Sequence, residues 1–379
     1  MRFRDEFSVG GEIIGYFLHF LIMGATLQRK EFEPAIQGLR GLSALSVIIT
    51  HLRGMPDLAG FLPELPNWIG AALTTGGHGV ELFFIISGYL IPASLIRHKL
   101  ISKFLYDRCL RILPVFAVLH FLLFIIGPLV GYKFFKGIDL FTYIKLFFVN
   151  LFFLPWALGL PAGQQNAWTL SFEWMFYIGT ASLYFFAFQR KNWVAAATVA
   201  IVLIGLVWSF PIAAYFVVGA LFSVHKFQLR LSGGLGVLVG LICLGSMYAL
   251  LQNGDILLSI IPAFLLFAMV LTPASGMAKF LESRMWQFLG KISYSLYLVH
   301  PFVLFPLQMF GQTLARQGVD KWWAWAVFIV IGLSASIAVA SLSHDMLEVR
   351  LRRSVDALLT GLAKRKIGSE QRLVSPEIL

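Results

Sequence analysis

Arg40 and His51 are ionisable side chains within an apolar run, Ile36–Leu52 (IQGLRGLSALSVIITHL), which is long enough to cross a bilayer when slightly tilted. Eleven residues separate them, so in a helix they share one face and lie roughly 16 Å apart along the axis. A charged residue in a membrane helix normally faces the bundle interior or a water-filled path, and such a residue is a candidate for a functional site. The alternative is that Arg40 snorkels to the inner surface and His51 caps the outer end of the helix.

A second group of polar residues is expected near the outer membrane surface, together with His51. It comprises His78 and Glu81, where one apolar run begins, and Trp168, Ser171 and Glu173, where another begins. Histidine with a carboxylate is the usual pair for general-base catalysis on a hydroxyl, because the acid fixes the tautomer of the imidazole. We expect Glu81 or Glu173 to orient His51. The alternative is that both acids cap the N-termini of their helices, where the helix dipole favours negative charge.

A basic group is expected at the inner surface. Five Lys and Arg side chains fall in what reads as one short loop, namely Arg97, Lys99, Lys103, Arg108 and Arg111. The last two are three residues apart, so they share one helical face. Such a group suits a phosphate-bearing cofactor, and coenzyme A has a charged head and a slender arm that can reach towards His51. The alternative is that these basic residues only set membrane topology.

Composition restricts the class of protein. Hydrophobic residues make up 58% and charged residues 13%, with a mean hydropathy of +0.80, values typical of a polytopic membrane protein. The two cysteines, Cys109 and Cys243, lie in apolar segments, so neither a disulfide framework nor a thiolate metal site is predicted. The net charge of +11 is spread among membrane segments, which the positive-inside rule explains better than nucleic-acid binding.

Charge placement also predicts the topology. Of eleven apolar runs, the one at 140–155 is a poor span because it contains Lys145, Asn150 and Pro155. Without it, ten spans with both termini cytoplasmic place most of the 30 Lys and Arg inside. Those left outside are Arg53, Lys133, Lys136, Lys145, Arg316 and Lys321. We therefore predict an all-α polytopic integral membrane protein of about ten transmembrane helices, with an interfacial or re-entrant segment near 140–155.

Three regions are expected along the chain. Residues 1–31 form an N-terminal extension, in which Gly11–Leu27 is expected to be an interfacial helix. Residues 32–348 form the transmembrane domain, and residues 349–379 form a basic cytoplasmic tail with no appended soluble catalytic domain.

Five motifs in order resemble the membrane-bound acyltransferase-3 family, which includes bacterial O-antigen, exopolysaccharide and Nod-factor acyltransferases. The resemblance covers roughly Phe32 to Glu348. The motifs are Gly38-Leu39-Arg40 with His51 after ten intervening residues, GVELFFIISGYLI at Gly79–Ile91, Arg108-Cys-Leu-Arg111-Ile-Leu-Pro114, WTLSFEWMFY at Trp168–Tyr177 and ISYSLYLVHP at Ile292–Pro301. In the last motif Tyr294, Tyr297 and His300 are alternatively hydrogen-bonding groups between helices.

The resemblance implies transfer of an acyl group, commonly acetyl, from cytoplasmic acyl-CoA to an acceptor at the outer face. The first motif corresponds to the family's Arg and His, the third to its basic loop, and Trp168–Glu173 to its Trp-Ser-Leu-Ser-x-Glu block. Three positions depart from the family pattern. Glu81 replaces an Asp, Trp174 replaces a second acid, and Glu348-Val349-Arg350 replaces Glu-Arg-Pro, so no role is carried over from that last motif.

The resulting hypothesis is an integral-membrane O-acyltransferase in a bacterial inner membrane, with His51 as general base and a saccharide or glycolipid hydroxyl as acceptor. The predicted catalytic residues are His51, Glu173, Glu81 and Ser171, and the predicted acyl-CoA-binding residues are Arg40, Arg108, Arg111 and Tyr177. Ser171 or Tyr177 would polarise the thioester carbonyl, and a variant passes through acyl-His51 or acyl-Ser171.

No metal and no nucleic acid are expected to bind, and the oligomeric state is left open. Two rival hypotheses are a transporter or flippase of a lipid-linked saccharide, since polar residues in membrane helices also line transport paths, and an inactive acyltransferase-like scaffold.

Overall fold

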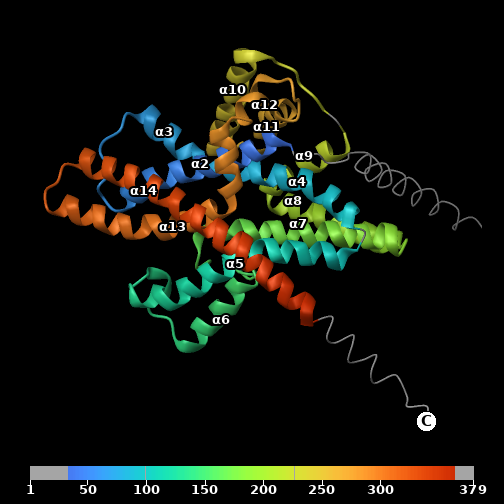
Figure 1. The fold of residues 1–379 in the computed structure, drawn as a ribbon, viewed down its shortest axis with the longest axis horizontal. Helices are drawn as coiled ribbons and strands as arrows, with labels where there is room; N and C mark the ends of the chain where they lie inside the picture. Colours follow the sequence, from blue (N-terminus) through green and yellow to red (C-terminus); the bar gives the residue numbers. More distant parts are fainter. Residues whose placement is uncertain (1–32, 99, 226, 363–379) are drawn as a thin grey trace, which may run out of the picture.

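The computed structural model describes residues 33–98, 100–225 and 227–362, and within these ranges every regular element is a helix (Figure 1). The predicted all-α class is confirmed. The interfacial helix expected at Gly11–Leu27 and the end of the basic tail lie outside the described residues. Across the boundary expected at residue 348, a π-helical stretch, His344–Leu351, continues the preceding helix, so no change of element marks that position.

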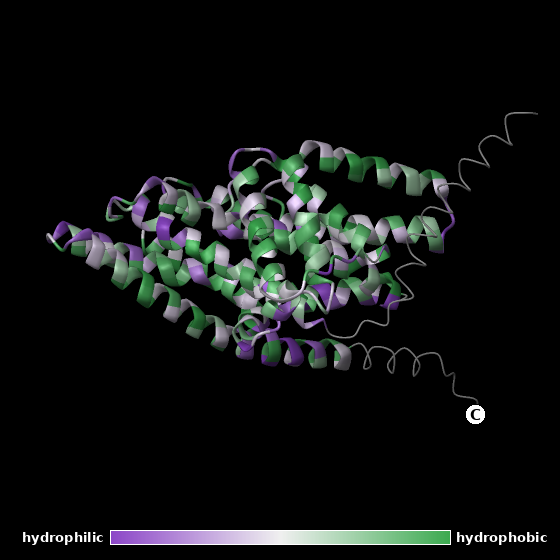
Figure 2. Ribbon diagram, turned by 90° about the horizontal axis from the view of Figure 1, so that it is seen from above, coloured by the Kyte–Doolittle hydropathy of each residue, from purple (hydrophilic) through white to green (hydrophobic). Residues whose placement is uncertain are grey.

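The helices account for the apolar runs of the sequence. In the part of the chain that the structure describes, six helical stretches are long and apolar enough to cross a membrane: α2 (Pro34–Leu58), α3 with α4 (Asn67–Thr75 and Gly79–His98), α5 (Ile101–Leu129), α10 (Gly233–Gln252), α13 (Arg284–Arg316) and α14 (Lys321–Ser343, continuing to Leu362). The shorter helices are α6 (Leu140–Leu151), α7 (Trp168–Tyr184), α8 (Trp193–Ser209), α9 (Ala214–Val224), α11 (Ile256–Val270) and α12 (Gly276–Leu281). Figure 2 shows hydrophobic residues along most of the length of the helices, as expected for a multi-pass membrane protein.

The segment expected near 140–155 does not form a full span. Helix α6 has 12 residues, about 18 Å at 1.5 Å per residue, whereas the hydrocarbon core is about 30 Å thick. It ends at Leu151, and Phe153 follows with a positive φ of 60°. The side chain of Asn150 then holds the returning chain, because its Oδ1 accepts a hydrogen bond from the Gly163 amide at 2.8 Å. The segment therefore turns back.

The returning loop packs against a proline in α13. Pro301 has no amide hydrogen, so the Tyr297 carbonyl four residues earlier lacks its helical partner. The Asn166 side-chain amide donates to that carbonyl, and the Tyr297 hydroxyl donates back to the Asn166 carbonyl at 2.8 Å. Gln164 donates to the neighbouring Leu298 carbonyl at 3.1 Å. The loop thus satisfies the carbonyl that the proline leaves open and adds a hydrogen bond to the next one.

Helices α2 and α13 run parallel. Gln287 near the start of α13 donates to the Pro34 carbonyl at 2.7 Å, and Gln308 further along donates to the Met55 carbonyl at 3.0 Å. If both helices cross the membrane, they must cross in the same direction. Ten spans satisfy this condition, whereas counting 140–155 as an eleventh span would make them antiparallel.

The two helices touch backbone to backbone at glycines. A Cβ atom added to Gly290 would lie 1.9 Å from the Gln37 carbonyl oxygen, and one added to Gly41 would lie 2.7 Å from the Gly290 nitrogen. Small residues permit such close helix packing in membranes, where dispersion contacts and hydrogen bonds replace the hydrophobic effect between helices. The register of the pair is therefore set where no side chain separates them.

Replacing Gly290 with Ala is expected to push α2 and α13 apart and destabilise the detergent-solubilised protein. Overpacking of this kind costs roughly 1–3 kcal/mol. The measurement is thermal unfolding followed by size-exclusion chromatography. Gly245→Ala in α10 is the control, because its added Cβ would meet nothing within 4 Å. Equal unfolding temperatures for the two variants would contradict the role given to Gly290.

Candidate functional site

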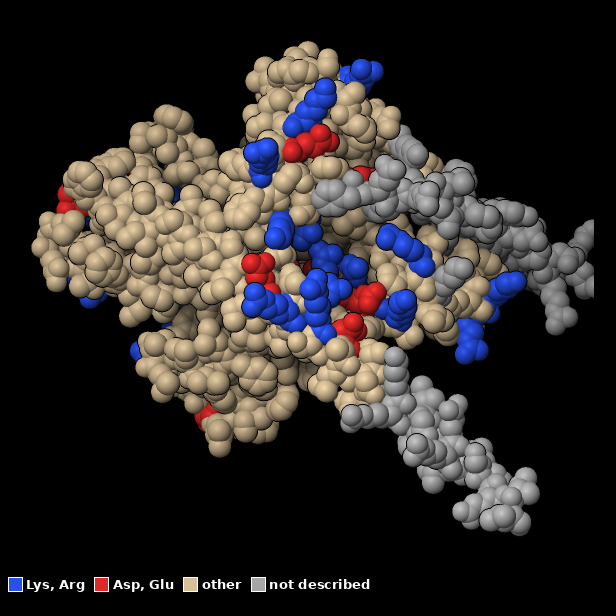
Figure 3. All heavy atoms as spheres, in the orientation of Figure 1, with Lys and Arg blue, Asp and Glu red and all other residues tan. Residues whose placement is uncertain are grey.

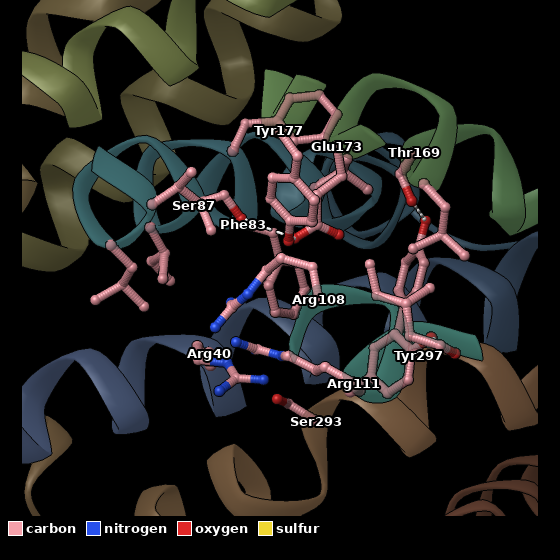
Figure 4. A pocket seen from close by; sticks show the side chains of 18 residues that line it. Arg40, Phe83, Ser87, Arg108, Arg111, Thr169, Glu173, Tyr177, Ser293 and Tyr297 are labelled. Atoms are coloured by element: carbon pink, nitrogen blue, oxygen red, sulfur yellow. Dashed lines mark hydrogen bonds between the residues drawn. The ribbon is translucent and has the colours of Figure 1, made fainter. Parts of the chain in front are cut away.

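Three arginines converge on one pocket between α2, α4, α5, α7 and α13. Arg40 comes from α2, and Arg108 and Arg111 come from α5. Figure 4 shows their guanidinium groups pointing towards one another. Figure 3 shows Lys and Arg gathered around a hollow in the middle of one face of the molecule. The predicted common face of Arg108 and Arg111 is confirmed.

The basic residues do not form the predicted loop, and that prediction is wrong. Helix α5 already begins at Ile101, so Lys103, Arg108 and Arg111 are helical, and only positions 99 and 100 separate α4 from α5. The reason is visible in the sequence: Ile101, Phe104 and Leu105 have helical spacing, and Phe104 is fully buried. The helix therefore starts before the continuous apolar run.

One acid faces the three arginines. Glu173 of α7 accepts hydrogen bonds from Ser87 of α4 at 3.1 Å and from the Tyr177 hydroxyl. Its spacing of four residues from Tyr177 puts both on one face of α7. Three guanidinium groups and one carboxylate leave a net positive charge among the pocket-lining residues. A partly buried positive excess of this kind favours an anionic ligand.

The pocket is narrow. Its enclosed volume is about 70 Å³, far below the roughly 300–1,000 Å³ of sites that hold a small molecule whole. Apart from the charged groups, its walls are mainly aromatic and aliphatic, with Phe83, Phe84 and Tyr297 among them. A pocket of this size excludes a bulky charged head, which would remain at its mouth.

His51 lies outside the pocket lining, further along α2. Its Nδ1 is 2.8 Å from the Val47 carbonyl oxygen, so Nδ1 carries the hydrogen and Nε2 presents a lone pair. The His51 ring packs edge-on against His300 of α13, with centroids 4.8 Å apart. The Tyr297 ring, which lines the pocket, is 6.2 Å from that of His300. Contacts between the rings of Tyr297, His300 and His51 therefore link the pocket wall to His51.

The expected pairing of His51 with an acid is not found among the described residues. Glu81 accepts from His78 at 3.1 Å, because α4 begins at Gly79 and places the two side chains within one turn of each other. Glu173 is held in the pocket by its two hydroxyl donors. The outer polar group predicted from the sequence is thus divided among different sites.

Five of the eight predicted site residues line the pocket, namely Arg40, Arg108, Arg111, Glu173 and Tyr177. His51, Glu81 and Ser171 do not. Ser171 is buried, but the face of α7 that lines the pocket carries Leu170, Glu173 and Tyr177. The Tyr177 hydroxyl donates to Glu173, so its hydrogen is already engaged.

Glu348 is a residue that the sequence analysis left without a role. One of its oxygens accepts from the Ser295 amide at 3.0 Å and from the Ser295 hydroxyl at 2.5 Å. It acts on Arg40 as an opposite charge, as Glu173 does. Two features of the sequence could have pointed to Glu348: it is an acid in the closing segment, and its partner Ser295 lies within the motif at Ile292–Pro301.

Among the described residues, no group of three or more His, Cys, Asp or Glu is arranged to hold a metal ion.

Comparison with known proteins gives one family. The acyltransferase domain model matches residues 33–342. Peptidoglycan O-acetyltransferase OatA of Listeria monocytogenes is 22% identical over 87% of this chain and 57% of its own length. Nodulation protein 10 of Rhizobium leguminosarum is 27% identical over 44% of this chain and 48% of its own length. Putative peptidoglycan O-acetyltransferase YrhL of Bacillus subtilis is 28% identical over 40% of this chain and 23% of its own length.

These relatives are longer than the part that they share with this chain, which spans little more than half of OatA and less of the other two. No solved structure matches the chain. The family match nevertheless covers most of the sequence and all of the helices that build the pocket. The chain belongs to the membrane-bound acyltransferase-3 family and is a multi-pass membrane protein.

Proposed function

We propose that this protein is an O-acyltransferase that moves an acyl group, acetyl in the first instance, from cytoplasmic acyl-CoA to a hydroxyl of a saccharide or glycolipid at the outer face of a bacterial inner membrane. The observation that carries the proposal is the convergence of three arginines on a narrow pocket, connected to His51 through the rings of Tyr297 and His300. The names of the relatives support O-acetylation and a cell-wall saccharide as the kind of acceptor.

The donor is assigned by charge and shape. Guanidinium groups bind phosphate oxygens through charge-assisted, often paired hydrogen bonds. Arg108 and Arg111 would hold the phosphates of coenzyme A, and Arg40 would guide the arm. The slender pantetheine arm with its thioester would enter the narrow, mainly apolar pocket, while the nucleotide head stays at its mouth.

The chemistry is assigned to His51. Its Nε2 lone pair would take the proton of the acceptor hydroxyl while the hydroxyl oxygen attacks the thioester carbon. The carbon–sulfur bond then breaks, and the imidazolium returns the proton to the departing thiolate, so that CoA leaves as the thiol. Direct transfer of this kind needs no acyl-His51 or acyl-Ser171 intermediate.

His51→Ala is expected to lower acetyl transfer by about 10²- to 10⁴-fold, the usual contribution of a general base. The assay follows CoA release from labelled acetyl-CoA by the purified protein, with soluble peptidoglycan fragments and other oligosaccharides as acceptors. His120→Phe is the matched control, because His120 is a buried intramembrane histidine packed among phenylalanines of α5 and α6. Substantial transfer by the Ala variant would rule out the assigned base.

The same assay separates the rival functions. Label that crosses a vesicle membrane without CoA release would support a transporter. Protein that binds acetyl-CoA but releases no CoA with any acceptor would support a scaffold. CoA release that depends on the saccharide acceptor supports the enzyme.

Arg111→Ala is expected to weaken CoA binding about 10- to 100-fold, because a hydrogen bond to a charged group contributes roughly 1.5–3 kcal/mol. Equilibrium dialysis with labelled CoA measures this dissociation constant. Lys279→Ala is the control, since Lys279 is an exposed cation of α12 that does not line the pocket. If both variants bind CoA as the parent protein does, the phosphate assignment fails.

A further inference from the structure

His300 is a buried side chain next to the proposed base, His51, and the mechanism above gives His300 no role. Its side chain is fully buried, and its ring lies 4.8 Å from that of His51, with an angle of 70° between the ring planes. The parallel register brings the two together: Gly41 faces Gly290 where the helices touch, and each histidine lies ten residues further along its own helix.

Hydrogen bonds fix the tautomers of both rings. The Nδ1 of His300 is 2.9 Å from the Leu296 carbonyl oxygen, as that of His51 is 2.8 Å from the Val47 oxygen. Each ring therefore carries its hydrogen on Nδ1 and a lone pair on Nε2. The Nε2 of His300 is buried and has no hydrogen-bond partner in the part of the chain that the structure describes. A buried acceptor left unpaired is costly and calls for an explanation.

An unpaired imidazole nitrogen is not sufficient by itself. His120 also has a buried Nε2 without a partner, but Phe116, Phe124 and Phe147 surround it. What distinguishes His300 is its neighbour, the residue that takes up a proton during the proposed reaction.

In hydrolases, an acid next to the catalytic histidine holds the ring and stabilises the imidazolium. No acidic side chain contacts His51 among the described residues, because Glu81 pairs with His78 and Glu173 accepts from Ser87 and Tyr177. At His51 the Val47 carbonyl already accepts from Nδ1, and a neutral acceptor elsewhere beside the ring adds to that stabilisation without burying a further charge in the membrane. Two positive rings so close together would repel each other strongly, so His300 fits this role as the neutral partner.

We propose that His300 is a positioning residue that holds the His51 ring by edge-to-face packing and stabilises its protonated form through the Nε2 lone pair. The inference rests on the function proposed above. The proton stays on His51 from the attack on the thioester until it passes to the thiolate, and His300 exchanges no proton. The acceptor atom of His300 therefore contributes more to catalysis than the packing of its ring.

Two substitutions separate packing from the lone pair. His300→Phe keeps a ring but has no acceptor atom, whereas His300→Gln keeps an acceptor oxygen but has no ring. We expect the Phe variant to lose about 10- to 100-fold in kcat, with the KM for acetyl-CoA unchanged within about twofold. The Gln variant should keep more activity than the Phe variant. His120→Phe, the same exchange at the other buried imidazole, should leave kcat unchanged.

The assay measures CoA release from labelled acetyl-CoA, with soluble peptidoglycan fragments and separately with water as the acceptor. Thermal unfolding verifies that each variant is folded. If the Phe variant does not fold, Gln and Ala at position 300 make the same comparison, with and without an acceptor atom. Full activity of the Phe variant, or a folded Gln variant as inactive as the variant without an acceptor, would overturn the proposal.

A double substitution distinguishes this inference from the general-base proposal. If His300 acts through His51, adding His300→Phe to His51→Ala causes no further loss of kcat, whereas an independent structural defect would add to it. Should His51→Ala remain active, the general-base proposal itself fails. If His51→Ala is inactive and His300→Phe is normal, only the inference about His300 fails.

Discussion

The backbone contact between α2 and α13 is the constraint on which the rest of the structure depends. Without side chains between them at Gly41 and Gly290, the two helices are held in one register. Hydrogen bonds from α13 glutamines to α2 carbonyls extend that register along both helices. The register of the two helices places the residues of α2 that cost most to bury, Arg40 and His51, beside residues of α13. Arg40 meets the pocket there, and His51 meets His300.

The charges of the pocket follow from that placement. Arg40 could not be held in a membrane bundle without compensation, and Glu173 and Glu348 act on it as opposite charges. Arg111 acts on it as a like charge. The three guanidiniums are therefore only partly neutralised, and Glu173 is itself shared with two hydroxyl donors. A positive excess within a mostly apolar wall is costly, and an anionic ligand would offset that cost.

The sequence predicts elements well here because apolar length and charge bias are local properties. The helical class and the short segment at 140–155 could both be read from it, as could the common face of Arg108 and Arg111. The predicted loop before α5 is wrong because the basic residues there obscure the apolar spacing at Ile101 and Phe104, from which the helix begins. The pairing of Glu173 with Ser87 could not be predicted, because it depends on how α4 and α7 are rotated in the bundle. Nor could the pairing of His51 with His300, which needs the register of two helices some 250 residues apart.

That register alone does not complete the site, because α7 must also present Glu173 and Tyr177 in the right rotation. Pro301 provides the link. By leaving the Tyr297 carbonyl without a helical partner, it creates an acceptor in α13 that Asn166 fills. The Tyr297 hydroxyl bonds back to the Asn166 carbonyl, and Thr169 donates to the same hydroxyl at 3.2 Å. Helix α7 starts two residues after Asn166, so these contacts fix its rotation relative to α13. One proline thus couples the turned-back segment, the arginine pocket and the ring beside His51.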